Sequence, residues 1–91
     1  LYDDVTSRIE DATVAGLLIA KASLAGERRV ALELDPASRV GRIDDDLSRD
    51  LSTIVGNLVD NALDAVAGAV RPRVVVRLEE AGGELVVRVR D

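Results

Sequence analysis

Apolar residues recur at helical spacing through residues 1–28, which predicts one or two helices at the start of the chain. The apolar positions with this spacing are Val5, Ile9, Val14, Leu17, Leu18, Ala22 and Ala25. Asp11 is suited to cap a second helix after a short first one, and Gly26 is suited to end that second helix. A single interrupted helix fits the same spacing equally well.

Strict alternation replaces this spacing in residues 29–34, where Val30, Leu32 and Leu34 fall on one side. This pattern is typical of a half-buried strand, and we expect Asp35-Pro36 to end it. Residues 73–80 and 84–90 alternate in the same way on either side of Ala81-Gly82-Gly83. They predict a β-hairpin, in which the glycines form the turn and not a phosphate-binding loop, because no helix start follows them.

A polar stretch containing Gly41 and Asp44-Asp45-Asp46 leads into the longest periodic segment, residues 47–69. The three aspartates suit a helix N-terminus, because carboxylates are stabilised there. The expected core-facing residues of this helix are Leu47, Leu51, Ile54, Val55, Leu58, Ala62, Leu63 and Val66. Gly68 and Pro72 mark its end. Together these elements predict an α/β (α+β) fold, a two-layer α/β sandwich with helices on one face of a mixed sheet.

The composition narrows the function classes. The 91 residues carry a formal charge of −5, are 47% hydrophobic, and include Tyr2 as the only aromatic residue, so the core must be aliphatic. Without Cys and His, the chain has no disulfides, thiolate zinc sites, cysteine nucleophiles or histidine bases. An acidic chain without a basic run is also a poor candidate for binding nucleic acid or a membrane surface. A chain that lacks Met and begins with Leu1 is expected to be part of a longer protein.

The polar side of the long helix is unusual in its composition. Asp50, Thr53, Asn57, Asn61 and Asp64 fall on one side, opposite the apolar stripe. Asn and Asp are weaker helix formers than the Lys, Glu, Arg or Gln that usually cover such a face, so a role beyond helix stability is indicated. Asn57 and Asn61 lie one turn apart, so both amides can reach one ligand, either a hard cation or a phosphate. A solvated polar face is the alternative explanation, and Lys21 is expected to be a solvated charge.

The run from Ile54 to Val66, which contains Asn57-Leu58-Val59-Asp60-Asn61, resembles the asparagine box of the histidine-kinase ATP-binding domain. That domain belongs to a superfamily shared with gyrase-type topoisomerases and heat-shock chaperones. Residues 14–34 resemble the stretch before the box in sensor kinases of the citrate and dicarboxylate type, and residues 72–91 resemble the hairpin after it. The resemblance covers nearly all of the chain.

The resemblance implies specific roles for four residues. Asn61 would coordinate the Mg2+ that bridges the nucleotide phosphates, and Asn57 would line the same phosphate site. Asp91 matches the aspartate that accepts a hydrogen bond from the adenine amino group at the start of the family's next motif, whose glycines are beyond this chain. Asp64 stands where many sensor kinases have a phosphate-neutralising lysine, and an acidic residue there is suited to hold a magnesium-bound water. ATP-hydrolysing relatives have a glutamate base at the position of Asn57, and an amide cannot act as that base.

The function implied by the resemblance is that of a sensor histidine kinase in a two-component system. Residues 1–28 would be a helical segment leading into the domain, and residues 29–91 the N-terminal part of the ATP-binding domain. The implied cofactors are ATP and Mg2+; the implied partners are the phosphoacceptor histidine domain of the same protein, a response regulator and a second copy in a homodimer. The implied location is cytoplasmic. An ATP-hydrolysing relative and a noncatalytic interaction module are the alternatives, and these 91 residues alone are expected to bind ATP weakly or not at all.

Overall fold

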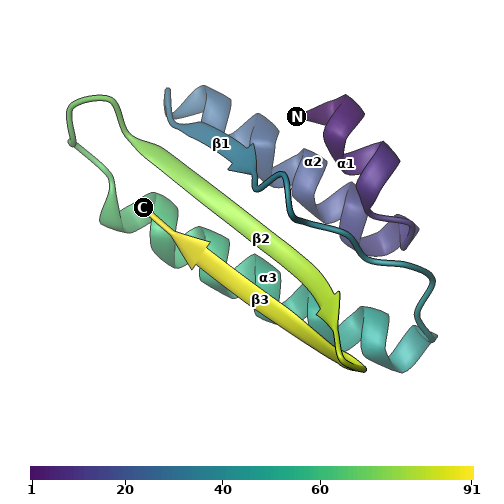
Figure 1. The fold of residues 1–91 in the computed structure, drawn as a ribbon. Helices are drawn as coiled ribbons and strands as arrows, with labels where there is room; N and C mark the ends of the chain where they lie inside the picture. Colours follow the sequence, from purple (N-terminus) through teal and green to yellow (C-terminus); the bar gives the residue numbers. More distant parts are fainter.

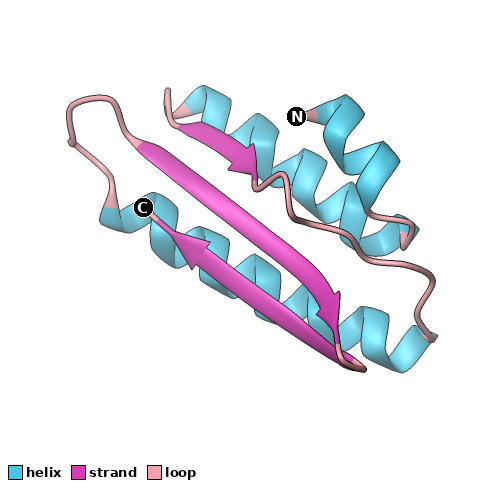
Figure 2. Ribbon diagram, viewed as in Figure 1, coloured by secondary structure: helices cyan, strands magenta, loops and turns pink.

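Helices and strands form two layers in the computed structural model, which describes all residues 1–91 (Figures 1 and 2). The elements in chain order are α1 (Tyr2–Arg8), α2 (Ala12–Glu27), β1 (Ala31–Leu34), α3 (Asp45–Ala65), β2 (Arg73–Ala81) and β3 (Glu84–Arg90). Helices α2 and α3 pack side by side beneath the sheet, and α1 packs against α2 (Figure 1). The predicted two-layer α/β sandwich is confirmed. No helix combines the length and apolarity needed to cross a membrane.

The sheet is mixed, with the order β1-β2-β3. β1 pairs with β2 in parallel, with Ala31 beside Arg73, whereas β2 and β3 form the predicted antiparallel hairpin. Gly82 and Gly83 both have positive φ angles, 59° and 81°, as expected for a two-residue hairpin turn. The sequence did not indicate that the loop after β1 also joins the sheet, through an isolated bridge between Arg39 and Glu79.

Aspartate side chains begin both long helices. Asp11 accepts a hydrogen bond from the Val14 backbone N–H at 3.0 Å, and Asp44 accepts one from the Leu47 N–H at 2.8 Å. These caps satisfy backbone donors that have no partner within the helix. Asp11 also accepts a hydrogen bond from the Ser48 hydroxyl at 2.7 Å, which ties the start of α2 to the first turns of α3. The first segment is therefore two helices rather than one interrupted helix.

The ends of the helices differ from the expected ones. Gly26 does not end α2; the helix continues to Glu27 and closes at Arg29, whose φ is +58°. The Val30 N–H then donates to the Ala25 carbonyl at 2.8 Å, which completes a left-handed helix cap. This cap delays the strand expected from residue 29 until Ala31. α3 spans 45–65 and not 47–69, so its last expected turn lies in the connection to β2.

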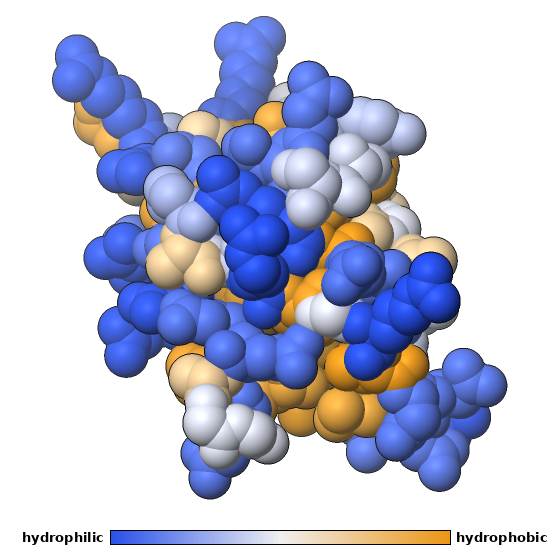
Figure 3. Space-filling view, turned by 45° about the vertical axis from the view of Figure 1, so that its right-hand side comes forward, coloured by the Kyte–Doolittle hydropathy of each residue, from blue (hydrophilic) through white to orange (hydrophobic).

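The core is a single cluster of 16 buried aliphatic residues, as the composition predicts. The contribution of α3 differs from the expected stripe, because Leu47, Ile54 and Leu58 are 39%, 49% and 38% exposed. The buried positions of α3 are Ser48, Leu51, Val55, Val59 and Leu63. A methyl group added at Gly56 would lie 3.7 Å from the Leu17 side chain, so α2 covers the other flank of α3. Figure 3 shows hydrophobic side chains at the surface between the hydrophilic ones.

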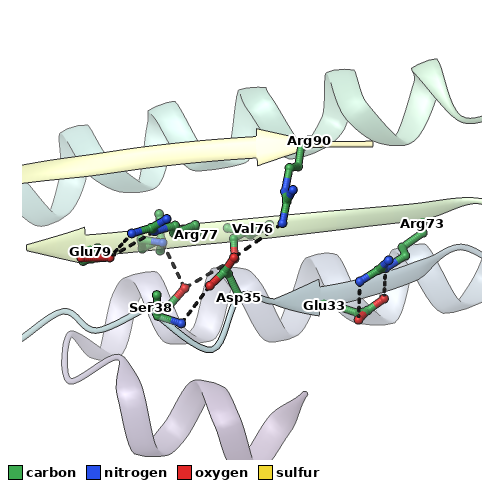
Figure 4. Close-up of polar contacts among 10 residues, drawn as sticks. Glu33, Asp35, Ser38, Arg73, Val76, Arg77, Glu79 and Arg90 are labelled. Carbon is green, nitrogen blue, oxygen red and sulfur yellow. Dashed lines mark hydrogen bonds and ion pairs between the residues drawn. The ribbon is translucent and has the colours of Figure 1, made fainter.

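Charged residues cover the face of the sheet that the helices leave open (Figure 4). Arg73 pairs with Glu33 across β1 and β2, and Arg77 pairs with Glu79 at 2.6 Å. The hydrogen bond to Glu79 and its negative charge raise the pKa of Arg77, so this guanidinium stays charged. Below this layer, the buried Ser38 hydroxyl accepts a hydrogen bond from the Leu78 N–H at 3.2 Å.

Candidate functional site

The polar residues of α3 lie together on its outer face, away from the sheet. The asparagines and their neighbours are all exposed: Asp50, Thr53, Asn57, Asn61 and Asp64. This face points away from the core, because the buried residues lie on the opposite side of the helix and recur every four positions: Leu51, Val55, Val59 and Leu63. The structure therefore places four of the five sequence-predicted side chains on one side of three successive turns, from Thr53 to Asp64.

The amides of Asn57 and Asn61 make no side-chain hydrogen bond within the chain, in contrast to their neighbours. The Thr53 hydroxyl donates to the Arg49 carbonyl at 3.0 Å. Asp60 and Asp64 each accept a hydrogen bond from a basic side chain of α2. An amide carries both a carbonyl acceptor and an NH2 donor. Two such amides one turn apart, free of partners within the protein, are available to a ligand that offers oxygens and a bound cation.

Two ion pairs link α2 to the margin of this face. Lys21 Nζ lies 2.6 Å from Asp60 Oδ1, and Arg28 Nη1 lies 3.1 Å from Asp64 Oδ1. The expectation that Lys21 is a solvated charge is wrong, because its side chain is only 19% exposed between the two helices. The sequence contains a signal for these pairs: residues 21 and 28 share one face of α2, and residues 60 and 64 share one face of α3. Without the knowledge that the helices run in parallel, that signal could not be used.

A cavity of about 330 Å3 opens beside the last turn of α3. Arg28 and Asp64 lie at its lining, together with aliphatic parts of Val30, Leu63 and Pro72. The cavity is thus continuous with the outer face of α3 through Asp64, which lies three residues after Asn61. Neither Asn57 nor Asn61 lines a cavity; both lie on the open surface of the helix.

Asp91 directly follows β3, and β3 runs along α3 in the same direction (Figure 1). Asp91 therefore lies toward the C-terminal end of α3. It shares a small cavity of about 110 Å3 with Arg73, Val75 and Arg90, at the end of the sheet. The structure does not bring Asp91 into one cavity with Asn57, Asn61 or Asp64.

The donor set fits magnesium only when a ligand brings further oxygens. No group of three or more His, Cys, Asp or Glu side chains gathers in a way that could hold a metal ion. Mg2+ requires six oxygen ligands in near-octahedral geometry and commonly takes them from phosphates, water and one or two side chains. The Asn61 carbonyl can supply one of these, so the face suits a metal that arrives together with phosphate.

Comparisons with known proteins give relatives of one kind. No family model matches the chain, and no solved structure matches it. The chain is 32% identical over 91 residues to the sensor protein CitS of Bacillus subtilis, and 29% identical over 87 residues to CitS of Halalkalibacterium halodurans. It is 32% identical over 94 residues to the sensor histidine kinase DpiB of Escherichia coli.

The three matches cover 92–100% of this chain and 16–17% of each relative. The chain therefore spans about one sixth of the length of the curated relatives it matches. The chain is thus similar to a segment of two sensor proteins and of one sensor histidine kinase.

Proposed function

We propose that this chain is part of the ATP-binding catalytic domain of a two-component sensor histidine kinase. In this proposal, residues 29–91 are the N-terminal part of the domain, and residues 1–28 lead into it. Mg-ATP binds against the outer face of α3, on the cytoplasmic side of the membrane. Its γ-phosphoryl group passes to a histidine on the dimerisation domain of the same protein and then to a response regulator.

The observation that carries this proposal is the pair of unpartnered amides on α3. Asn57 and Asn61 are exposed and lie one turn apart, while the neighbouring carboxylates of Asp60 and Asp64 are held by cations from α2. In this proposal the side-chain carbonyl of Asn61 binds Mg2+, and the side-chain NH2 group of Asn57 donates to a phosphate oxygen. Catalysis in such a site is mainly the positioning of ATP and the neutralisation of its charge by the metal.

The side chains of the face favour phosphoryl transfer over hydrolysis. Asn57 occupies the position from which a glutamate would activate water, and an amide has no basic group for that step. The chain contains no His, so the phosphoryl acceptor must lie on another part of the protein. In this proposal Asp91, which follows β3, accepts a hydrogen bond from the adenine amino group.

Nucleotide binding by the full-length protein tests this proposal. Asn61→Ala should weaken Mg-ATP binding by at least about tenfold in isothermal titration, because the metal loses its protein ligand. Removal of magnesium with a chelator should weaken binding to the unmodified protein by a similar factor.

Asp50→Ala is the matched control for this measurement. Asp50 is exposed on the same face of α3 and makes no ion pair, so its replacement should change Mg-ATP affinity less than about twofold. Equal affinities for the Asn61→Ala and unmodified proteins would contradict the proposal. An ATP affinity that does not change when magnesium is removed would also contradict it.

A further inference from the structure

The outer face of α3 supplies no positive charge of its own to a bound triphosphate. Its exposed residues are neutral or acidic: Asp50, Thr53, Asn57, Asn61 and Asp64. A triphosphate carries several negative charges, and phosphate oxygens are bound most strongly by charged donors such as Arg and Lys. Arg49, the one cation of α3, pairs with Asp46 at 3.2 Å and lies two turns before Asn57. If nucleotide binds here, as proposed above, a cation near Asn61 other than the metal must come from a different element.

Two cations of α2 form ion pairs with aspartates of α3 near Asn61. Lys21 is committed to Asp60 at 2.6 Å, and only 19% of its side chain is exposed. Arg28 contacts Asp64 through one nitrogen at 3.1 Å, and its side chain is 46% exposed. A guanidinium has five N–H donors in a planar fork, so most of the donors of Arg28 remain free. Of the two cations, Arg28 is the more exposed and keeps more free donors for a ligand while it contacts its carboxylate.

Arg28 is also placed beside free space. It lines the cavity of about 330 Å3 at the end of α3, and Asp64 lines the same cavity from the helix. Asp64 lies three residues after Asn61, which is one helical turn along the same outer face. Asp64, and with it the guanidinium that it contacts, therefore lies about one turn beyond Asn61 and two turns beyond Asn57, so an extended polyphosphate bound at Asn61 can reach Arg28.

We propose that Arg28 binds the distal phosphates of the nucleotide and that Asp64 is a positioning residue that holds its guanidinium in place. This inference rests on the proposed function and extends it to a residue outside the asparagine-containing helix. It also accounts for the acidic residue at position 64. A carboxylate there repels phosphate when considered alone, but it becomes an anchor once an arginine from α2 lies against it.

The test compares ATP with AMP in the full-length protein, because AMP lacks the distal phosphates. We expect Arg28→Gln to weaken Mg-ATP binding by about tenfold and to change AMP binding less than about twofold. Lys21→Gln is the matched control: it removes a cation from the same face of α2 and should leave the ratio of ATP to AMP affinity unchanged. Thermal unfolding of each variant separates lost binding from lost folding.

A second variant tests whether a positive charge at this place is what the nucleotide requires. Replacing Asp64 by Lys in the Arg28→Gln background puts a cation back at the same place, so it should restore most of the lost ATP affinity. An Arg28→Gln protein that folds and keeps the unmodified ratio of ATP to AMP affinity would overturn the inference, and so would a double variant without recovery. If the unmodified protein binds no Mg-ATP, or if Asn61→Ala has no effect, the proposed function itself fails.

Discussion

Two arginines adopt a backbone conformation that most side chains avoid. Arg29 and Arg71 have φ angles of +58° and +57°, in the left-handed region that favours glycine. Arg29 closes α2, and Arg71 lies two residues before β2, so the two turns lead into the paired starts of β1 and β2. The Ala31 N–H donates to the Pro72 carbonyl at 3.0 Å between them. These turns set where the parallel pairing begins.

Glycine at position 29 should stabilise the chain. The left-handed conformation costs a non-glycine residue about 1–2 kcal/mol, and the extra freedom of glycine in the unfolded chain offsets about half of that gain. We expect Arg29→Gly to raise the free energy of unfolding by about 0.5–1 kcal/mol in urea denaturation. Glu27→Gly, inside the last turn of α2, should lower it by a similar amount. A loss of stability in Arg29→Gly would show that the Arg29 side chain makes a contribution larger than the backbone cost.

At the scale of the element, the strands could be predicted from the sequence more closely than the buried face of α3. The alternating pattern located β1, β2 and β3 to within two residues at each end. In a strand, successive side chains point to opposite faces, so the pattern identifies the buried face whichever element packs against it. The helical stripe was less informative, because an apolar residue at helical spacing can lie at the centre of the buried face or at its edge. Val59 is buried, although it was not among the expected core residues, and Ile54 is 49% exposed although it was.

The difference between the expected and the observed buried face of α3 arises from the elements that pack against this helix. Packing of α2 against Gly56 turns the centre of the buried face of α3 toward α2, which leaves Leu47, Ile54 and Leu58 at the opposite, partly exposed margin. No local pattern contains this information. The same holds for the candidate site: the sequence located the amides on the polar face, whereas the Arg28–Asp64 contact depends on the parallel arrangement of two helices.

Adjacent substitutions in α3 test the corrected stripe. Val59→Ala should lower the free energy of unfolding by about 2 kcal/mol, because it leaves a cavity at a position with no solvent exposure. Leu58→Ala removes a larger side chain but from a partly exposed position, so its cost should stay below about 1 kcal/mol. Chemical denaturation of the two variants gives the comparison. The reverse order of the two losses would support the stripe expected from the sequence.

At the scale of the whole molecule, the sheet has an unprotected edge. β3 pairs only with β2, so its other side presents backbone N–H and C=O groups without partners in the sheet. Val86 is 37% exposed on the open face of the same strand. A long edge strand with exposed apolar residues is a site at which a second strand can add.

Association through this edge is therefore expected when the 91-residue chain is concentrated. Val86→Lys should reduce the association measured by light scattering or sedimentation, because a charge on the edge strand opposes strand addition. Val70→Lys is the control: Val70 is 92% exposed in the connection between α3 and β2, so a lysine there should leave association unchanged. Equal reduction by both variants would point to a general effect of charge rather than to β3.

The position of the single aromatic residue determines how this molecule can be observed. Tyr2 lies in α1 and is 63% exposed, while the 16 core residues are all aliphatic. Intrinsic fluorescence and near-ultraviolet circular dichroism thus have no chromophore in the core, and a native sample gives nearly the tyrosine signal of an unfolded one. A weak near-ultraviolet spectrum would not be evidence of a molten globule here. Far-ultraviolet circular dichroism and amide or methyl NMR signals are the probes that report on the packing of α2 and α3 against the sheet.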